Sequence, residues 1–261
     1  MYIFAIITLF CLSFFLSAYA INDEPIFISE NNIFSDKIIF DGKWTYETEW
    51  KATTLKTLNF ENGTKIHFRI THDDRFIYAF FDVINDNLFM KISDRALLCL
   101  DTVDNQNEKP DTNDYCFIAQ LGSKNGAVFQ GGSNLPSKNY YKKISNPMDY
   151  IAIGEISDEN DRYSKIPHTS YEFRIPTELT GRTDVYGIFL QVYDYPSGKI
   201  YTWPDKSSSD ISKPNTWGKL ISPTKSIPEF EHPLIIFLSL SAVLLFINFS
   251  KFTKKFQTHL M

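Results

Sequence analysis

Apolar and polar residues alternate over much of the chain, and the pattern is clearest around "RITHDDRFIYAFFDV", Arg69–Val83. The segment Lys65–Ile70 alternates polar and apolar residues, which is typical of a strand with one buried face. From Phe76 to Phe81 both alternating sets are apolar, so we expect this second strand to be buried on both faces. The polar segment Thr71–Asp74 supplies the side-chain acceptors that a tight turn needs. The sequence therefore predicts a hairpin inside a β-sandwich.

Similar runs, separated by Gly, Pro, Asn and Asp, recur along residues 21–222, and no stretch there sustains a helical period. "PTELTG", Pro176–Gly181, predicts at most one helical turn ended by glycine. The predicted strands are Lys37–Phe40, Thr64–Thr71, Phe76–Val83, Ala96–Asp101, Tyr115–Leu121, Ala127–Gln130, Tyr150–Ile156, Ser170–Ile175, Asp184–Tyr193 and Gly218–Ser222. The predicted fold class is all-β, an antiparallel β-sandwich spanning residues 21–222.

A long apolar run precedes this domain. Residues 1–20, "MYIFAIITLFCLSFFLSAYA", end in Ala18-Tyr19-Ala20, the small-x-small pattern of a signal-peptide cleavage site. The sequence therefore predicts a signal peptide and an exported protein.

A second apolar run follows the domain. Residues 234–250 are long enough for a short membrane span, and the lysines that follow in residues 251–261 are typical of a cytoplasmic basic tail. The polar, Pro-containing segment 223–233 predicts a linker. Within it "PEF", Pro228–Phe230, resembles the short motif of archaeal sorting tails. We expect a protein anchored in the cell membrane by a C-terminal transmembrane helix and displayed on the cell surface.

The charge balance and the motifs narrow the function. The chain has 31 Asp and Glu against 26 Lys and Arg, a formal net charge of −5, and no basic cluster in residues 21–222. We therefore expect no nucleic-acid partner. The sequence contains no G-x-S-x-G, no H-E-x-x-H, no phosphate loop and no dinucleotide fingerprint. A binding protein without catalytic activity is the better prediction.

The cysteines and one asparagine carry predicted covalent features. Cys99 and Cys116 flank a polar loop between two predicted strands, so antiparallel pairing would bring them opposite one another. In an exported protein this arrangement predicts a disulfide, with two buried free thiols as the alternative. "NGT" at Asn62 is a glycosylation sequon in a predicted turn.

The order of several motifs resembles that of the family 9 carbohydrate-binding modules and the wider DOMON-like β-sandwich group. These motifs are "DGKWTYETEW" (Asp41–Trp50), "ITHDDRFIYAFFDV" (Ile70–Val83), "SDRALLCLDT" (Ser93–Thr102), "YEFRIP" (Tyr171–Pro176) and "YTWPD…PNTWGKL" (Tyr201–Leu220). The resemblance spans nearly the whole predicted domain. It implies a β-sandwich that binds carbohydrate or a cell-envelope glycan.

The resemblance also implies how a sugar would be held. Family 9 modules place a sugar between two tryptophans, whose rings stack on the apolar face of a pyranose. Trp203 in "YTWPD" is expected in a loop after a strand and is the candidate platform, with a structural lid as the alternative. Trp44 and Trp50 are expected in the core. Lys91 stands where the second tryptophan is expected.

The family's polar contacts are matched only in part. Leu97 stands where a sugar-binding glutamate is expected, while Asp94 and Asp101 match. The predicted ligand-binding residues are therefore Trp203, Asp94 and Lys91. The departures at Lys91 and Leu97 favour an alternative function, a structural envelope protein whose sugar site is lost.

The acidic loop after the strand of Cys99 suggests a metal. It contains hard oxygen ligands, and family 9 modules use structural calcium. The predicted calcium ligands are Asp101, Asp104, Asp111 and Asp114. A solvated hairpin tip is the alternative.

The DOMON-like group also includes b-type haem domains that transfer electrons, and this is the second alternative function. Their iron is held by Met with His or Lys. Residues that could serve here are Met90, Met148, His67, His72, Lys91 and His168.

Overall fold

The computed structural model describes residues 24–31 and 38–222. The predicted signal peptide, linker, transmembrane segment and tail (residues 1–20, 223–233, 234–250 and 251–261) lie outside the described residues. Within residues 24–31 and 38–222, no helix is both long enough and apolar enough to cross a membrane.

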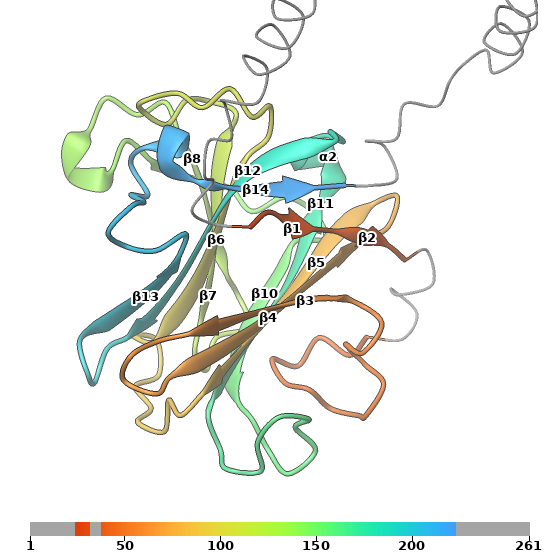
Figure 1. Ribbon diagram of the computed structural model, residues 1–261. Helices are drawn as coiled ribbons and strands as arrows, with labels where there is room; N and C mark the ends of the chain where they lie inside the picture. Colours follow the sequence, from red (N-terminus) through yellow and green to blue (C-terminus); the bar gives the residue numbers. More distant parts are fainter. Residues whose placement is uncertain (1–23, 32–37, 223–261) are drawn as a thin grey trace, which may run out of the picture. The chain divides into compact units, whose positions relative to one another are not determined.

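The described chain folds into two sheets (Figure 1). The larger sheet has the order β1-β14-β12-β6-β7-β8-β9, with β13 also paired to β12. It contains β1 (Ile26–Phe27), β6 (Arg95–Asp101), β7 (Asp114–Gln120), β8 (Ala127–Gln130), β9 (Lys142–Ile144), β12 (Val185–Asp194), β13 (Lys199–Trp203) and β14 (Gly218–Ile221). The smaller sheet has the order β10-β11-β5-β4-β2, with β3 also paired to β4. It contains β2 (Ser29–Glu30), β3 (Thr54–Asn59), β4 (Lys65–His72), β5 (Phe76–Ile84), β10 (Ile151–Ile156) and β11 (Thr169–Pro176).

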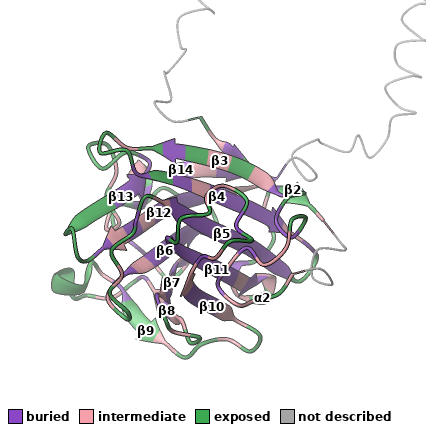
Figure 2. Ribbon diagram, turned by 90° about the horizontal axis from the view of Figure 1, so that it is seen from below, coloured by how far each residue is buried: buried purple, intermediate pink, exposed green. Residues whose placement is uncertain are grey.

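The predicted β-sandwich is confirmed, and most predicted strands match observed ones to within a residue at each end. The single helical turn α2 (Thr177–Thr180) is also confirmed. The predicted strand at Lys37–Phe40 is wrong, since residues 38–40 form no strand. The short strands β1 and β2, the edge strands β3 and β9, and β13 were not predicted. β3 and β9 lie at sheet edges with mostly exposed or half-exposed residues, so they lack the apolar alternation of a central strand (Figure 2).

The sandwich is not antiparallel throughout. β1 pairs in parallel with β14, and β2 pairs in parallel with β4. Ile28 lies between β1 and β2; its N–H donates to the carbonyl of Ile221 (2.8 Å), and its side chain is buried. The chain therefore passes from the edge of one sheet to the edge of the other, and Ile28 contributes to the core between them.

β5 is buried on both faces, as the sequence predicts. Its inward residues join the core between the sheets, and its outward residues Phe76, Tyr78 and Phe80 pack with Trp44 and Trp50. The ring of Trp50 stacks on Phe80 with centroids 5.2 Å apart. Both tryptophans are fully buried, so the segment that carries them covers the outer face of the smaller sheet.

The polar segment before β5 is a turn, as predicted. One carboxylate oxygen of Asp73 accepts the N–H groups of Arg75 and Phe76 (2.7 Å each), and the other accepts the hydroxyl of Tyr78 (2.7 Å). Asp73 thus satisfies backbone donors that the reversal of the chain leaves free.

The predicted disulfide is confirmed. Cys99 on β6 and Cys116 on β7 are direct cross-strand partners and are joined by a disulfide, with Cα atoms 4.0 Å apart. The bridged residues are 17 apart in sequence. A disulfide that closes a loop of this size stabilises the folded state by about 3 kcal/mol, because it restricts the unfolded chain.

Trp203 occupies a different environment from the loop that the sequence suggested. It is the last residue of β13, opposite Leu190, and only 4% of its surface is exposed. Its indole lies against Gly218, where any Cβ would come within 2.4 Å of the ring. The Trp203 ring packs in the core between the sheets and has no open face on which a sugar could stack.

We expect Trp203→Ala to lower the free energy of unfolding by about 3–5 kcal/mol, because it removes a buried indole and leaves a cavity. Ile200→Ala, on the same strand at a residue 38% exposed, is the control, with a change of about 0.5 kcal/mol or less. Urea unfolding followed by far-ultraviolet circular dichroism measures both. Equal stability of the two variants would contradict the core placement.

Candidate functional site

Half of the outer face of the larger sheet is closed. Tyr141 and Trp217, which are 5% and 6% exposed, pack with the disulfide and with Phe189 on this face. The indole N–H of Trp217 donates to the carbonyl of Asp210 (3.0 Å). This hydrogen bond joins the ring to the loop between β13 and β14. This half therefore offers no access to a ligand.

The other half of this face is half-exposed and carries polar and aromatic side chains in cross-strand rows. Arg95 on β6 lies opposite both Tyr193 on β12 and Gln120 on β7. In the next row Leu97 lies opposite Gln191. Because paired residues on one face are neighbours, Tyr193, Arg95 and Gln120 form a continuous strip across three strands.

Arg95 is held over an aromatic ring. Its guanidinium carbon is 4.5 Å from the centre of the Tyr193 ring, a cation–π distance. The ring of Tyr195 meets Tyr193 edge-on, with centroids 6.0 Å apart, and Tyr195 is 51% exposed. The guanidinium donates to the carbonyl of Ser93 (3.4 Å), and its other N–H groups have no partner among residues 24–31 and 38–222. This strip therefore presents free donors beside an exposed ring.

Asp94 connects the two loops that border the strip. One of its carboxylate oxygens accepts the N–H of Met90 (2.7 Å), and the other accepts the N–H of Tyr195 (2.8 Å). Asp94 is fully buried, and burial raises the pKa of its carboxyl. It fixes the loop of Lys91 relative to Tyr195, and its carboxylate is buried with both oxygens accepting backbone N–H groups.

Lys91 borders the strip on its other side. Its side chain runs against Gly122, where a Cβ would approach the lysine chain to 3.0 Å, and Gly122 has a φ of +73° that favours glycine. Gln120 reaches the same loop, since its Nε2 donates to the carbonyl of Ile92 (2.7 Å). We call this region the outer-face patch; it consists of Lys91, Arg95, Gln120, Gln191, Tyr193 and Tyr195.

The predicted ligand-binding residues thus divide. Lys91 lies in the patch, Asp94 supports it from below, and Trp203 lies in the core between the sheets. The sequence reasoning missed Arg95, Gln120 and the two tyrosines. These residues point outward from β6, β7 and β12 or lie at the end of β12. Which of them are neighbours is known only once the pairing of the strands is known.

The predicted calcium loop contains a buried acidic pair. Asp101 and Asp114 are cross-strand partners, and both are fully buried. The oxygen Oδ1 of Asp114 and the hydroxyl of Tyr141 are buried without a hydrogen-bond partner among the described residues. Burial, with the charges of Asp101 and Asp111 beside it, raises the pKa of Asp114 to about 7. The raised pKa shows that a second ionised carboxyl group is unfavourable beside Asp101 and Asp111 without a cation.

The other two predicted calcium ligands, Asp111 and Asp104, differ in their partners. Asp111 accepts hydrogen bonds from the amides of Asn105 and Asn107 (2.8 and 2.7 Å), while its N–H donates to Asp114 (2.6 Å). Asp104 forms an ion pair with Lys219. The structure thus groups Asp111 with the buried pair and pairs Asp104 with a lysine.

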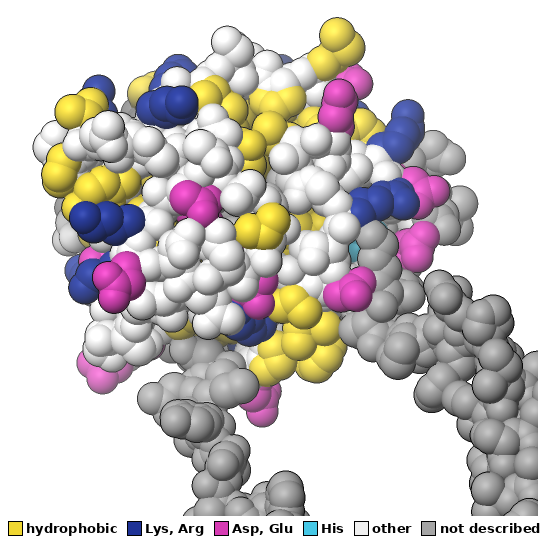
Figure 3. Space-filling view, turned by 90° about the horizontal axis from the view of Figure 1, so that it is seen from above, with side chains coloured by type: hydrophobic (Ala, Val, Ile, Leu, Met, Phe, Trp, Pro, Cys, Tyr) yellow, Lys and Arg dark blue, Asp and Glu magenta, His cyan; other side chains and the backbone are white. Residues whose placement is uncertain are grey.

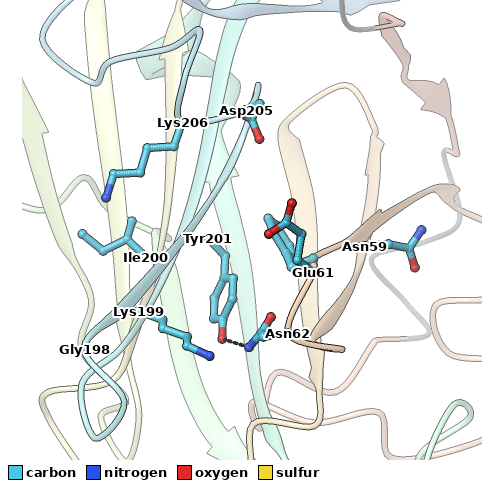
Figure 4. A pocket seen from close by; sticks show the side chains of 10 residues that line it. Asn59, Glu61, Asn62, Gly198, Lys199, Ile200, Tyr201, Asp205 and Lys206 are labelled. Atoms are coloured by element: carbon cyan, nitrogen blue, oxygen red, sulfur yellow. Dashed lines mark hydrogen bonds between the residues drawn. The ribbon is translucent and has the colours of Figure 1, made fainter.

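A polar depression lies between the hairpin of β3 and β4 and the edge strand β13 (Figure 4). It contains the predicted sequon: the amide Nδ2 of Asn62 donates to the hydroxyls of Thr64 and Tyr201 (2.9 Å each). The aromatic residues here, Phe60 and Tyr201, pack against each other with centroids 4.8 Å apart, and Tyr201 is buried. The depression is therefore polar but lacks an exposed ring, and glycosylation of Asn62 stays a prediction.

The possible haem ligands differ in their exposure and contacts. Met148 is 88% exposed and Met90 is 44% exposed. His67 stacks on Tyr163 with centroids 3.8 Å apart, and burial with the nearby cations lowers its pKa to about 4. His72 lies near the opposite end of β4, about 16 Å away at the rise of a strand. Haem binding stays a prediction.

Charged side chains of both signs are interspersed on the face seen in Figure 3. Lysine and arginine alternate there with aspartate and glutamate, and no large area of one sign stands out. Long-range attraction of a polyanion needs such an area, so this face gives it no support.

No protein-family model matches the chain, and no curated protein matches it. Among solved structures, the chain is similar to a family 9 carbohydrate-binding module from Caldicellulosiruptor kristjanssonii in complex with glucose. The TM-score is 0.51 at 12% identity, covering 76% of this chain and 95% of that chain. A family 9 module from the same organism in complex with cellotriose gives a TM-score of 0.49 at 13% identity, covering 78% and 98%. The first likeness shows that the chain shares the fold of family 9 modules.

Proposed function

We propose that this chain is a carbohydrate-binding protein without catalytic activity, and that it binds sugar at the outer-face patch. The observation that carries the proposal is the strip of Tyr193, Arg95 and Gln120 beside the exposed ring of Tyr195. The fold shared with a module solved in complex with glucose supports the same ligand class.

The patch has the two kinds of contact that a sugar needs. The exposed ring of Tyr195 can take the apolar C–H face of a pyranose. The guanidinium of Arg95 supplies planar N–H donors. Gln120 keeps its amide oxygen as an acceptor, because among the described residues only its Nε2 is engaged. Donors and acceptors side by side suit the adjacent hydroxyls of a sugar, each of which both donates and accepts.

This patch fits a sugar better than the predicted tryptophan clamp does. Trp203 is in the core, and Lys91 stands where the second tryptophan was expected. The patch also fits better than the depression at Asn62, whose rings are packed against each other. An exposed aromatic ring is what distinguishes the patch from both.

The absence of catalysis in the proposal rests on the side chains of the patch. Glycoside hydrolysis needs two carboxyl groups on either side of the scissile bond. The patch contains none, and the nearest carboxylate in sequence, Asp94, is buried with both oxygens accepting backbone N–H groups. The patch can therefore hold a sugar but has no acid and base to cleave it.

The proposed location is the outer face of the cell membrane, with the C-terminal apolar segment as the anchor. The apolar runs at the two ends of the sequence support it. The disulfide between Cys99 and Cys116 gives separate support, because such bridges persist in oxidising compartments outside the cytosol.

We also propose that calcium binds in the acidic loop through Asp101, Asp111 and Asp114. The unpartnered, buried Oδ1 of Asp114 supports this, because a hard divalent cation would satisfy it and offset the charge of its neighbours. Asp104, also predicted as a ligand, is engaged by Lys219. The proposed role is structural, joining the loop to β6 and β7.

For the calcium site, we expect a chelator to lower the melting temperature of calcium-loaded protein by about 5–10 °C at calcium 100-fold above the dissociation constant. Differential scanning calorimetry measures the shift. Asp114→Asn should abolish the shift, whereas Asp104→Asn, which alters a lysine-paired carboxylate, should retain it. A melting temperature unchanged by chelator would leave the loop as a solvated hairpin tip.

For the sugar site, we expect Arg95→Ala to weaken glycan binding about 10- to 100-fold, because it removes charge-assisted hydrogen bonds. The matched control is Arg75→Ala. Arg75, which is exposed whereas Arg95 is half-exposed, also lies over an aromatic ring, Phe76, at 5.3 Å on the other sheet. A glycan array with wild-type protein identifies the sugar, and titration calorimetry gives the affinities. If both variants bind equally well, or the wild type binds no glycan, the proposal is wrong.

A further inference from the structure

Three titratable side chains meet on the outer face of the smaller sheet, away from the outer-face patch and the acidic loop. They are Asp82 on β5, Asp161 in the loop after β10, and His168 just before β11. One ligand atom from each lies within 4.8 Å of the others. The side chains are 0–1% exposed, so water does not screen their charges.

The hydrogen bonds of His168 fix which nitrogen faces the carboxylates. Its Nδ1 lies 2.7 Å from the carbonyl oxygen of Ile166, which can only accept, so Nδ1 carries a hydrogen. Its Nε2 contacts Asp82 Oδ1 and lies 3.8 Å from Asp161 Oδ2. In the metal-free protein the contact of Nε2 with Asp82 is a hydrogen bond that Nε2 donates. A metal ion would replace the hydrogen on Nε2 and lie between this nitrogen and the two carboxylates.

Each carboxylate has an oxygen that the protein leaves unsatisfied. Asp82 Oδ2 and Asp161 Oδ2 are buried and have no hydrogen-bond partner among the described residues. The other oxygen of Asp161 accepts the N–H groups of Tyr163 and Ser164 (2.7 and 2.9 Å), so the loop holds this carboxylate in place. A buried, unpaired carboxylate oxygen costs free energy unless a donor or a cation satisfies it.

Glu172 on the same face shows how this protein satisfies a buried carboxylate. It is fully buried like Asp82, but one of its oxygens accepts the indole N–H of Trp50 (3.0 Å) and the other accepts the N–H of Gly42 (2.7 Å). In the cluster at His168, by contrast, Asp82 and Asp161 each keep one oxygen without a hydrogen-bond donor among the described residues.

The nearest arginine does not supply the missing positive charge. Arg69 interacts with Asp82 only at longer range, and its guanidinium donates to the hydroxyl of Tyr163 and to the carbonyls of Trp50 and Thr53. Burial raises the pKa of Asp82 to about 6 despite the neighbouring histidine. Burial alone would lower the pKa of His168, but its contacts with Asp82 raise it above the usual value. A protonated His168 supplies one positive charge to two buried carboxylates, so the closed site still lacks a full counter-charge.

We propose that Asp82, Asp161 and His168 bind a zinc ion that fixes the loop after β10 to the smaller sheet. Ligands about 2.0–2.2 Å from a tetrahedral ion lie about 3.4 Å apart, so ligand atoms within 4.8 Å of one another require a contraction of at most about 1.4 Å at the widest pair. An imidazole nitrogen with two carboxylates favours zinc over calcium, which prefers oxygen ligands alone. A second carboxylate oxygen or a water completes the tetrahedron.

The ion would have a structural role. One ligand, Asp82, comes from β5, and the other two are the first and last residues of the segment Asp161–His168. This segment contains Tyr163, whose ring meets Trp44 edge-on with centroids 5.8 Å apart. Binding would therefore stabilise the layer that covers the outer face of β5. Ser157 also contacts His168, but it is 4% exposed and accepts the backbone N–H of His168, so it is not a nucleophile open to substrate.

The test measures zinc in the full chain. Because the site is closed, the protein is unfolded in urea with EDTA, refolded with or without Zn²⁺, dialysed, and analysed by mass spectrometry of the metal. Asp161→Asn removes the charge but keeps an oxygen for the N–H groups of Tyr163 and Ser164. Asp86→Asn is the matched control, since Asp86 is also buried with an unpartnered oxygen and lies outside the cluster.

We expect about one zinc per chain in the wild type and in Asp86→Asn, and at least a tenfold loss in Asp161→Asn. The extended X-ray absorption fine structure of the bound zinc should show one imidazole ligand. If Asp161→Asn fails to refold, His168→Gln with the same readouts replaces it. Wild-type protein that retains no zinc would overturn the proposal. Zinc retained in Asp161→Asn but lost in Asp114→Asn would also overturn it and place the ion in the acidic loop.

Discussion

The structure depends on the burial of β5 on both faces. Its inward residues form the core with the larger sheet, and its outward aromatic residues require a second covering layer. A lone sheet would leave Tyr78 and Phe80 in water, so the segment with Trp44 and Trp50 and the loop with Tyr163 must close over them. This coverage encloses the polar residues that share the face, including Glu172 and Asp82. Each of them must then be satisfied by another group.

The outer face of the larger sheet is covered over only one half, and the candidate site lies on the uncovered half. The disulfide and the rings of Tyr141 and Trp217 close one half of its outer face. The other half keeps a charged and aromatic strip, where Arg95 lies over Tyr193. A face that is closed by packing on one side and open on the other gives a rigid base with an accessible edge, which is what a binding surface needs.

Alternation in the sequence was enough to predict the sandwich, the turn at Asp73 and the disulfide, because each depends on local pattern or on neighbouring strands. The patch was not predictable in the same way. Arg95 and Gln120 become neighbours only through the register of β6 with β7, and register is a tertiary property. Trp203 was misplaced for a related reason, since the edge strand β13 was not predicted and the ring was taken as part of a loop. The family resemblance gave the fold correctly but did not identify the residues of the proposed sugar site.

The most direct test of the proposed function is a crystal structure of this protein with a glycan that it binds. The account predicts electron density for a sugar ring against Tyr195, with hydroxyls within hydrogen-bond distance of Arg95 and Gln120. Density for the sugar in the depression at Asn62, or at an opened Trp203, with the patch bare, would contradict it.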